Sequence, residues 1–424
     1  MAREYKDSGI EWIGQIPKEW KVSRIKTIFS ERTELSENGD ETLLSVSEYY
    51  GVANRKEKIE DGDFVSRAES LVGYKKCYKG DLVSNIMLAW KGSLGVTDID
   101  GIVSPAYCVY QPSKEVFPHY YHYLFRTSLF TSIFRLYSKG IIDSRLRLYS
   151  PFFFAISTLI PPFSEQQKIA DYLDKVCGEV DEMVTLQETM IEELKAYKQS
   201  VITEAVTKGL NPNAPMRDSG IDWIGEIPEH WKVSRLKYFS IFINGFAFSS
   251  DVFTMGIGCK VIRIGDISRS LDLDGCVRAN IKTDALQSYR IKNNDIVIAM
   301  SGATTGKCCI AKDVDEAYIN QRVGIIRCDN YSYVYYSLQT DYFLEYINLN
   351  NAGSAQPNVS GVSIGNFPLL VPSLDEQQSI ASYLDTKCVE IDDLIAIKES
   401  KIEELKDYKK SVIYEYVTGK KEVV

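Results

Sequence analysis

Two long segments of the chain carry apolar residues at a spacing that is typical of helices. At residues 165–207 and again at 376–418, these apolar positions follow one another in steps of 4, 7, 3 and 7. Such a heptad-like stripe, in segments without proline, predicts two long coiled-coil-like helices. The stripe consists of Val180, Val184, Ile191, Leu194 and Val201 in the first segment and Ile391, Ile395, Ile402, Leu405 and Val412 in the second.

An apolar stripe of this length needs a partner, because most helical stability in proteins comes from packing of the apolar face. About 44 residues at about 1.5 Å each would form a rod of roughly 65 Å. We therefore predict that the two helices pair in antiparallel orientation, although the stripe is interrupted by Gln187 and Lys398 and by Lys198 and Lys409. The alternative is that each helix packs only on its own globular body. Ser164 and Asp375 are the expected helix caps.

The chain contains a duplication with a period of 211 residues. The sequence DSGIEWIGQIPKEWKVSRIK at residues 7–26 returns as DSGIDWIGEIPEHWKVSRLK at 218–237, with 15 of 20 positions identical. The two helical segments match at 25 of 43 positions with the same offset. Residues 27–160 and 238–371, which lie between these ends, share little identity. Constant ends around divergent middles indicate one scaffold that presents two different recognition surfaces. The repeated IPxxW sequences are expected to be packing motifs rather than nucleic-acid contacts.

Each divergent middle is expected to fold into a globular body of short strands and helices. An apolar strand, a glycine-containing loop and a second strand are predicted at residues 80–96 and 294–311, and a tyrosine-rich helix follows in both bodies. The fold class is therefore a mixed α+β one, with small mixed sheets and an internal pseudo-twofold repeat. The predicted domains are residues 1–160 (first body), 161–210 (central long helix), 211–371 (second body) and 372–424 (C-terminal long helix).

The charge distribution permits a nucleic-acid partner despite a net charge of −9. Residues 164–208 carry ten acids and five bases, and residues 375–420 carry eleven acids and seven bases. These two segments hold the entire excess of negative charge. The rest of the chain is neutral in total and leaves room for basic faces, which phosphate binding requires. Composition thus allows DNA binding without demonstrating it.

The compartment follows from what the sequence lacks. Its nine cysteines form no CxxC pair, its N-terminus MAREYKDSG is charged, and no apolar run is long enough for a membrane span. We expect reduced thiols, a cytoplasmic location and no membrane contact.

Loop residues of the two bodies are the candidates for DNA contact. Lys91 and Lys307 lie in the glycine-containing loops, where a lysine is suited to holding phosphate. Arginine, glutamine and asparagine can bind base edges through two hydrogen bonds. The candidates of this kind are Arg145, Arg147, Gln321, Arg322, Gln356 and Asn358. For any one of them the alternative is a solvated surface residue.

No catalytic or metal-binding arrangement can be assigned. SGATTGKC at residues 301–308 has three rather than four residues between its glycines, and Cys308 stands where a phosphate-binding loop needs Ser or Thr. IPPF at residues 160–163 lacks the leading Asp or Asn of adenine methyltransferases. His119 and His122 have no evident companion ligand. We therefore expect no catalytic residue, no metal and no cofactor in this chain.

The combined motifs resemble the specificity subunits of type I restriction-modification systems. The resemblance rests on IPxxWKVSR[IL]K at residues 16–26 and 227–237, on EQQxIAxYLD at 165–174 and 376–385, and on the GDLV and GATTGK loops of the bodies. It implies a non-catalytic subunit with two target-recognition domains. Each domain would read one half of a bipartite, asymmetric double-stranded DNA target.

The resemblance also implies partners. The paired helices would set the distance between the half-sites and dock two methyltransferase subunits, and restriction motor-nuclease subunits would join them. S-adenosylmethionine, ATP and Mg²⁺ would then be used by those partners for adenine methylation and DNA cleavage. Two rival hypotheses are a self-sufficient restriction or methylation enzyme, against which the missing motifs argue, and a coiled-coil adaptor without a DNA role. Salt-dependent binding of the assembled complex to duplex DNA would exclude the adaptor.

Overall fold

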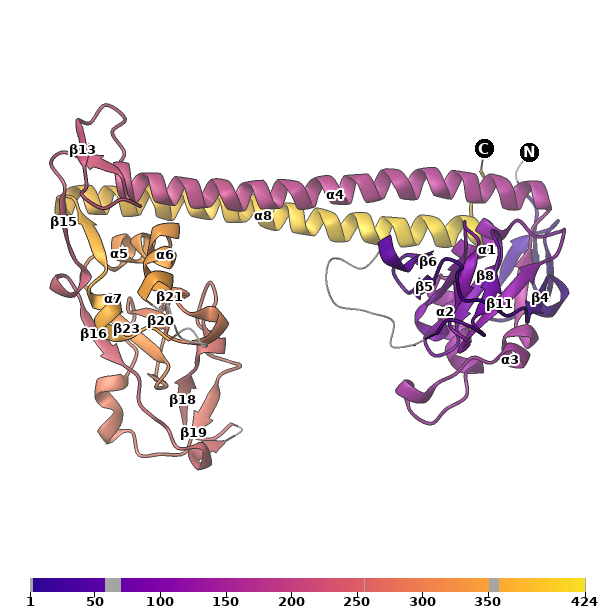
Figure 1. Ribbon diagram of the computed structural model, residues 1–424, viewed down its shortest axis with the longest axis horizontal. Coiled ribbons are helices and arrows are strands. Elements are labelled where there is room, and N and C mark those ends of the chain that lie inside the picture. The colour runs from indigo at the N-terminus through magenta and orange to yellow at the C-terminus, as the bar shows by residue number, and fades with distance from the viewer. Residues whose placement is uncertain (1–2, 58–69, 255, 351–357, 424) are drawn as a thin grey trace. The chain divides into compact units, whose positions relative to one another are not determined.

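The computed structural model describes residues 3–57, 70–254, 256–350 and 358–423. The chain forms two compact units (Figure 1). Unit 1 comprises residues 1–187 and 400–424, and unit 2 comprises residues 188–399. Each unit therefore combines one globular body with parts of two long helices.

The body of unit 1 is built on a four-stranded antiparallel sheet. Its strand order is β4-β11-β8-β9, with β4 at Phe29–Arg32, β11 at Tyr107–Pro112, β8 at Leu82–Asn85 and β9 at Leu94–Val96. The helices of this body are α1 (Pro118–Phe125), α2 (Ser128–Tyr137) and α3 (Ser150–Ala155). Aromatic side chains dominate the core between sheet and helices, among them Tyr110, Tyr121, Phe125 and Phe153.

Four two-stranded sheets complete unit 1. The opening passage forms the hairpin of β1 (Tyr5–Asp7) and β2 (Gln15–Pro17), and β3 (Lys21–Arg24) pairs with β12 (Ser157–Ile160) at the end of the body. The other two sheets are β5 (Leu44–Ser47) with β6 (Gly51–Asn54), and β7 (Lys75–Cys77) with β10 (Gly101–Val103). The β3–β12 pair joins the first and last segments of the body.

Unit 2 repeats this plan and adds a second sheet. Its first sheet has the order β16-β23-β20-β21, with β16 at Ile241–Asn244, β23 at Val323–Arg327, β20 at Ile296–Ala299 and β21 at Cys308–Ile310. The added sheet has the order β17-β19-β18-β22, with β17 at Phe253–Thr254, β19 at Val277–Ala279, β18 at Cys259–Ile262 and β22 at Ala317–Ile319. Because β18 and β22 run parallel, the predicted mixed sheets are confirmed.

The remaining elements of unit 2 match those of unit 1. They are the hairpin β13 (Met216–Asp218) with β14 (Glu226–Pro228), the pair β15 (Lys232–Arg235) with β24 (Pro368–Val371), and the helices α5 (Tyr331–Ser337), α6 (Asp341–Asn350) and α7 (Gly361–Gly365). The divergent middles thus share one core arrangement although their sequences differ.

The two predicted long helices are confirmed as α4 (Phe163–Lys208) and α8 (Leu374–Val417), with 46 and 44 residues. The predicted caps are wrong by two residues, because the helices begin at Phe163 and Leu374 and their cap positions are therefore 162 and 373 rather than Ser164 and Asp375. In α8 the Ser373 hydroxyl accepts a hydrogen bond from the Glu376 backbone N–H at 3.3 Å. Ser373 therefore satisfies one of the free N–H groups at the helix start.

The helices pair in antiparallel orientation within each unit. In unit 1 the rings of Tyr172 and Tyr416 lie 4.5 Å apart between centroids, and further along Asp181 meets Lys409. As the numbering rises on α4 it falls on α8. In unit 2, Lys198 of α4 meets Asp392 of α8.

Each helix end packs into the body of the other repeat. Val412 and Val417 of α8 belong to the core of unit 1, and Val201 and Val206 of α4 belong to the core of unit 2. The alternative that each helix packs only on its own body is therefore wrong. The chain after the end of α8 has room only for glycine at position 419. Gly419 has a φ of +71°, and a Cβ atom there would lie 2.5 Å from Pro17.

The predicted stripe is largely shielded from solvent. Its buried members are Val180, Ile191, Val201, Ile391, Ile395, Ile402 and Val412, and its half-buried members are Val184, Leu194 and Leu405. The repeated tryptophans divide into two kinds. Trp20 and Trp231 are buried, and Trp20 donates to Glu165 at 2.8 Å, whereas Trp12 and Trp223 are partly exposed.

Candidate nucleic-acid interface

Two loops meet at one face of the unit 1 body. The first follows β8 and contains a short 3-10 turn, Ala89–Lys91, that ends at Gly92 with a φ of 91°. The second lies between α2 and α3. The Leu148 backbone N–H donates to the Ile86 carbonyl at 2.9 Å and ties the two loops together.

The second loop of unit 1 is itself closed by backbone hydrogen bonds. Lys139 and Arg147 exchange two N–H to carbonyl bonds, each of 2.9 Å. Arg145 lies exposed in the turn between them, and the half-buried Arg147 guanidinium donates to carbonyls of its own loop. The structure thus holds both predicted arginines in one ordered loop.

A surface pocket of about 520 Å³ lies between these loops. Lys91 and Arg147 both line it, and its apolar wall comes from Met87, Leu88 and Trp90. Asp143 is the acidic residue of the lining, and Arg135 holds that carboxylate at 2.7 Å. The pocket therefore presents net positive charge over an apolar surface, which suits a sugar-phosphate or a base.

Two residues near this pocket, Arg135 and Ile141, were not among the candidates predicted from the sequence. The Arg135 guanidinium lies 4.9 Å from the centroid of the Trp90 ring, on which the Lys91 ammonium also lies at 5.3 Å. Ile141 is fully exposed in the loop. The isoleucine pair 141–142 is a sequence signal, because it stands in a loop flanked by basic residues. Arg135 gives no such signal, because it lies within an amphipathic helix.

The equivalent loops of unit 2 are joined in the same way. The Val359 backbone N–H donates to the Met300 carbonyl at 2.9 Å, and Asn358 forms a β-bridge with Ser301. Asn358 is exposed. Gln356 lies outside the described residues.

The cationic residues of unit 2 gather at the same place in the fold. The 3-10 turn Gly302–Thr304 leads to Lys307, which is exposed. Gln321 and Arg322 are also exposed, and Arg322 Nη1 lies 3.5 Å from the Ser301 hydroxyl. Arg322 and Asn358 thus approach the same residue, Ser301, while Lys307 follows on the adjoining turn.

Among the described residues, the candidate cations are free of ion pairs. No carboxylate of the described part of the chain forms a salt bridge with Lys91, Arg145, Arg147, Lys307 or Arg322. Charges that are already neutralised by a carboxylate contribute little to phosphate binding. These five cations therefore remain available to a polyanion.

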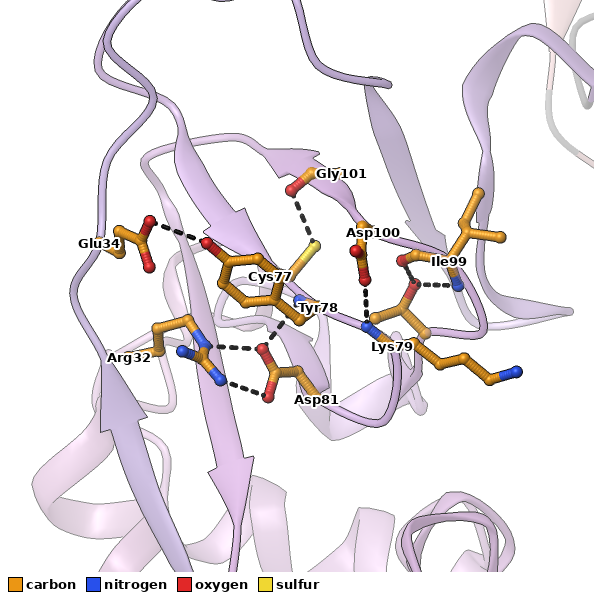
Figure 2. Close-up of polar contacts among 10 residues, drawn as sticks. Arg32, Glu34, Cys77, Tyr78, Lys79, Asp81, Ile99, Asp100 and Gly101 are labelled. Atoms are coloured by element: carbon orange, nitrogen blue, oxygen red, sulfur yellow. Dashed lines mark hydrogen bonds and ion pairs between the residues drawn. The ribbon is translucent and has the colours of Figure 1, made fainter.

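A buried ion pair supports the strand that leads to each of the loops carrying Lys91 and Lys307. In unit 1, Arg32 grips Asp81 through Nε at 2.7 Å and Nη2 at 3.1 Å (Figure 2). Asp81 is almost fully buried and also accepts from the Tyr78 backbone N–H at 2.9 Å. The hydrogen bond to Asp81 raises the pKa of Arg32, so this guanidinium stays charged and occupied.

In unit 2 the equivalent aspartate is also paired with an arginine, but this arginine comes from a different strand. Asp295 stands at the equivalent turn before β20, and Arg327 of β23 binds it at 2.7 and 2.6 Å. Arg32, by contrast, lies in β4. Breaking a buried pair of this kind leaves an uncompensated charge, which costs about 3–5 kcal/mol. These arginines therefore serve the fold rather than DNA contact.

Metal ligands and titratable groups with shifted pKa values are the remaining features of interest in the described residues. Groups of three or more metal-ligating side chains are absent from the part of the chain that the structure describes. Burial lowers the pKa of His122 to about 3, so this imidazole is neutral and accepts from the Val96 N–H. Burial also raises the pKa of the Cys77 thiol to about 12. Neither group is suited to acid-base or nucleophilic work near neutral pH. No described helix is long and apolar enough to cross a membrane.

Fold and site together define a duplicated recognition protein whose two bodies offer different side chains on one scaffold. The sequence pattern of the type I restriction modification DNA specificity domain matches residues 17–196 and 228–420, and the chain belongs to this family. The resemblance seen in the motifs is confirmed: this is a DNA-sequence specificity subunit of a type I restriction-modification system, a class of subunit without catalytic activity.

Relatives of this class match over most of the chain. The type I restriction enzyme MjaVIII specificity subunit of Methanocaldococcus jannaschii is 26% identical, covering 96% of this chain and 94% of its own. The EcoKI specificity subunit of Escherichia coli is 22% identical, covering 87% and 82%.

Solved structures share the fold at lower identity. The HsdS subunit of Thermoanaerobacter tengcongensis is 17% identical with a TM-score of 0.55, covering 95% of this chain and 98% of its own. A chain from a structure of complex assembly and conformational transition in a type I system reaches a TM-score of 0.72 at the same identity and coverage.

Proposed function

We propose that this subunit recognises a bipartite, asymmetric sequence in double-stranded DNA and that each body reads one half-site. The observation that carries the proposal is the repeated loop junction. The bonds Leu148 N–H to Ile86 and Val359 N–H to Met300 build the same junction twice. The side chains around it differ between the bodies, so the two half-sites would differ.

The chemistry of the side chains suggests a division of roles. Lys91 and Lys307 would hold phosphate and set the position of each body on the duplex. Base edges would be read by Arg145 and Arg147 in unit 1, and by Gln321, Arg322, Gln356 and Asn358 in unit 2. Arginine suits guanine, and asparagine or glutamine suits adenine, because each pair forms two hydrogen bonds.

We assign the spacing of the half-sites and the docking of partners to the paired helices. The family resemblance supports two methyltransferase subunits as the docked partners, with restriction motor-nuclease subunits joining them. The relatives named above are subunits of type I restriction enzymes, which supports these partners. S-adenosylmethionine, ATP and Mg²⁺ would be used by the partners, and the nine free cysteines fit the reducing cytoplasm.

The decisive test is to co-express the chain with its methyltransferase partner and map methylated adenines across a host genome by single-molecule sequencing. The expected result is one split motif, with two short defined halves around a gap of constant length. A stable complex that methylates without such a motif, or not at all, would overturn the proposal in favour of an adaptor without a DNA role.

A further inference from the structure

The hairpin β5–β6 of unit 1 is held by one half-buried arginine. Arg126 follows α1, and its guanidinium donates to five backbone carbonyls. Three belong to the hairpin turn, at distances of 3.2 Å to Ser47, 2.9 Å to Glu48 and 2.9 Å to Tyr49. The other two are the carbonyls of Gly92, directly after Lys91, at 3.3 Å and of Leu94, the first residue of β9, at 2.9 Å. One side chain thus joins two segments of the chain.

This guanidinium is balanced by carbonyl dipoles alone. No carboxylate of the described residues forms an ion pair with Arg126, and burial lowers its pKa. A guanidinium that is partly withdrawn from water needs hydrogen-bond acceptors, and the five carbonyls supply them here. Arg126 therefore fixes the geometry of both loops more tightly than an apolar contact would.

Close backbone packing beneath the hairpin reinforces the arrangement. A Cβ atom on Gly95 of β9 would lie 3.0 Å from the Gly51 Cα, and one on Gly51 would lie 2.8 Å from the His122 ring. Gly51 has a φ of +81°, which glycine adopts without strain. The Ser93 hydroxyl also donates to the Val46 carbonyl at 3.1 Å. The hairpin turn is therefore held beside the contact loop that carries Lys91.

What the turn presents is a tyrosine. Tyr49 is 84% exposed at its tip, whereas the neighbouring Tyr50 is engaged through its hydroxyl with Ser45 at 3.0 Å. Tyrosine combines a stacking face with a hydroxyl, so an exposed tyrosine at this place can meet a base or a sugar. The loop that Arg126 joins to this turn carries Lys91, the candidate phosphate contact.

Unit 2 has no arginine at the position equivalent to Arg126. At the position equivalent to Arg126 it has Gln339, whose amide donates to the Cys308 sulfur at 3.1 Å. The Gln339 carbonyl accepts from Gln199 of α4 at 2.8 Å. In place of the hairpin, unit 2 has the added four-stranded sheet. The arginine and the tyrosine are thus features of one half-site reader.

We propose that Tyr49 contacts duplex DNA in unit 1 and that Arg126 is the positioning residue that holds it beside Lys91. The inference rests on the proposed function, because it assigns a further contact to the same DNA site. Tyr49 would use its ring or hydroxyl against the sugar or base next to the phosphate that Lys91 binds. Only the half-site read by unit 1 depends on it.

The test uses the complex assembled with the methyltransferase and compares duplexes that are altered in one half-site at a time. Tyr49→Ala is expected to weaken binding about tenfold and to reduce discrimination in one half only. Arg322→Ala in unit 2 should reduce discrimination in the other half. Tyr238→Ala, which removes another exposed tyrosine, is the matched control and should leave both halves unchanged.

The positioning role of Arg126 is tested by combining its substitution with that of Tyr49. Arg126→Gln should reproduce the loss seen in Tyr49→Ala, and the double variant should bind no more weakly than Arg126→Gln alone. Losses that multiply in the double variant would overturn the positioning role. Unchanged discrimination by Tyr49→Ala, in a complex whose wild-type form reads a split motif, would overturn the contact itself. Absence of a split motif in the wild type would instead refute the proposed function.

Discussion

Lys409 of α8 donates to both carboxylate oxygens of Asp181 of α4, at 2.6 and 2.7 Å. The residues 211 positions away form the reciprocal pair in unit 2, where Lys198 of α4 donates to Asp392 of α8 at 2.6 Å. These lysines form one of the two pairs of residues that interrupt the apolar stripe. Each finds an aspartate on the facing helix, so the interruption selects the register in which the two helices pair.

Exchanging the charges of one pair tests this register. Asp181→Lys should lower the free energy of unfolding by about 0.5–1 kcal/mol, since exposed and half-exposed pairs contribute little more. Adding Lys409→Asp should restore most of the loss. Thermal or denaturant unfolding of the full chain measures both. The same exchange at Asp407 and Lys410, an exposed pair along α8, is the control and should change nothing measurable. If the double exchange stayed as unstable as the single one, the pair would not select the register.

A matched deletion tests whether the helices set the spacing of the half-sites. Removing residues 186–192 and 397–403 shortens both helices by one heptad and keeps each lysine opposite its aspartate. The loss of about 10 Å corresponds to about three base pairs. The methylation map should therefore show a gap shorter by about three base pairs with unchanged half-sites.

The control for this deletion is the removal of residues 186–192 alone, which cannot preserve both ion pairs and should destabilise the subunit. A functional matched deletion with an unchanged gap would show that the helices do not set the spacing.

Phosphate and base contacts should differ in their salt dependence. Lys91→Ala is expected to weaken binding to all duplexes alike and to lower the slope of log K against log salt by about one. Arg322→Ala should cost about 1–3 kcal/mol on the specific duplex and relax one half-site. Binding titrations at several salt concentrations measure both. A Lys91 variant that altered sequence preference would contradict its assignment to phosphate.

His122 predicts a pH dependence of stability. Burial lowers its pKa to about 3 in the folded chain, well below the value of about 6.5 in an unfolded one. Between these values the unfolded chain binds the proton and the folded chain does not. The free energy of unfolding is therefore highest above pH 6.5, as far as this group is concerned, and it decreases as the pH falls below 6.5. The slope from this group approaches about 1.4 kcal/mol per pH unit.

The measurement is unfolding of the wild type and of His122→Asn between pH 7 and pH 4. The stability difference between them should narrow as the pH falls, because asparagine does not titrate. His119→Asn serves as control, since the His119 side chain is partly exposed and pairs with Asp98 at 3.0 Å. A constant difference across this range would refute the assignment of a neutral, buried His122.

Sequence reasoning succeeds here where the signal is local or repeated. Apolar spacing located α4 and α8 to within a few residues, and the 211-residue offset identified the repeat. The glycines and basic residues also indicated the loops that carry the candidate DNA contacts, and their contact with DNA stays a prediction. Arg126 and Tyr49 escaped, because nothing in the sequence indicates that a guanidinium after α1 lies against carbonyls 77 to 79 residues earlier. Arg32 and Arg327 show the same difficulty, since equivalent aspartates are paired from different strands.

By itself, the sequence determined the family, the duplication, the two helices and the absence of recognisable catalytic motifs. All of these rest on residue identity and short-range periodicity. Only the tertiary structure decided that Val417 of α8 packs in the core of unit 1 and Val206 of α4 in that of unit 2. It also decided that Lys198 and Lys409 are paired rather than free, and that the two loops of each body meet. These are contacts between distant segments, and they depend on how whole elements pack rather than on any local pattern.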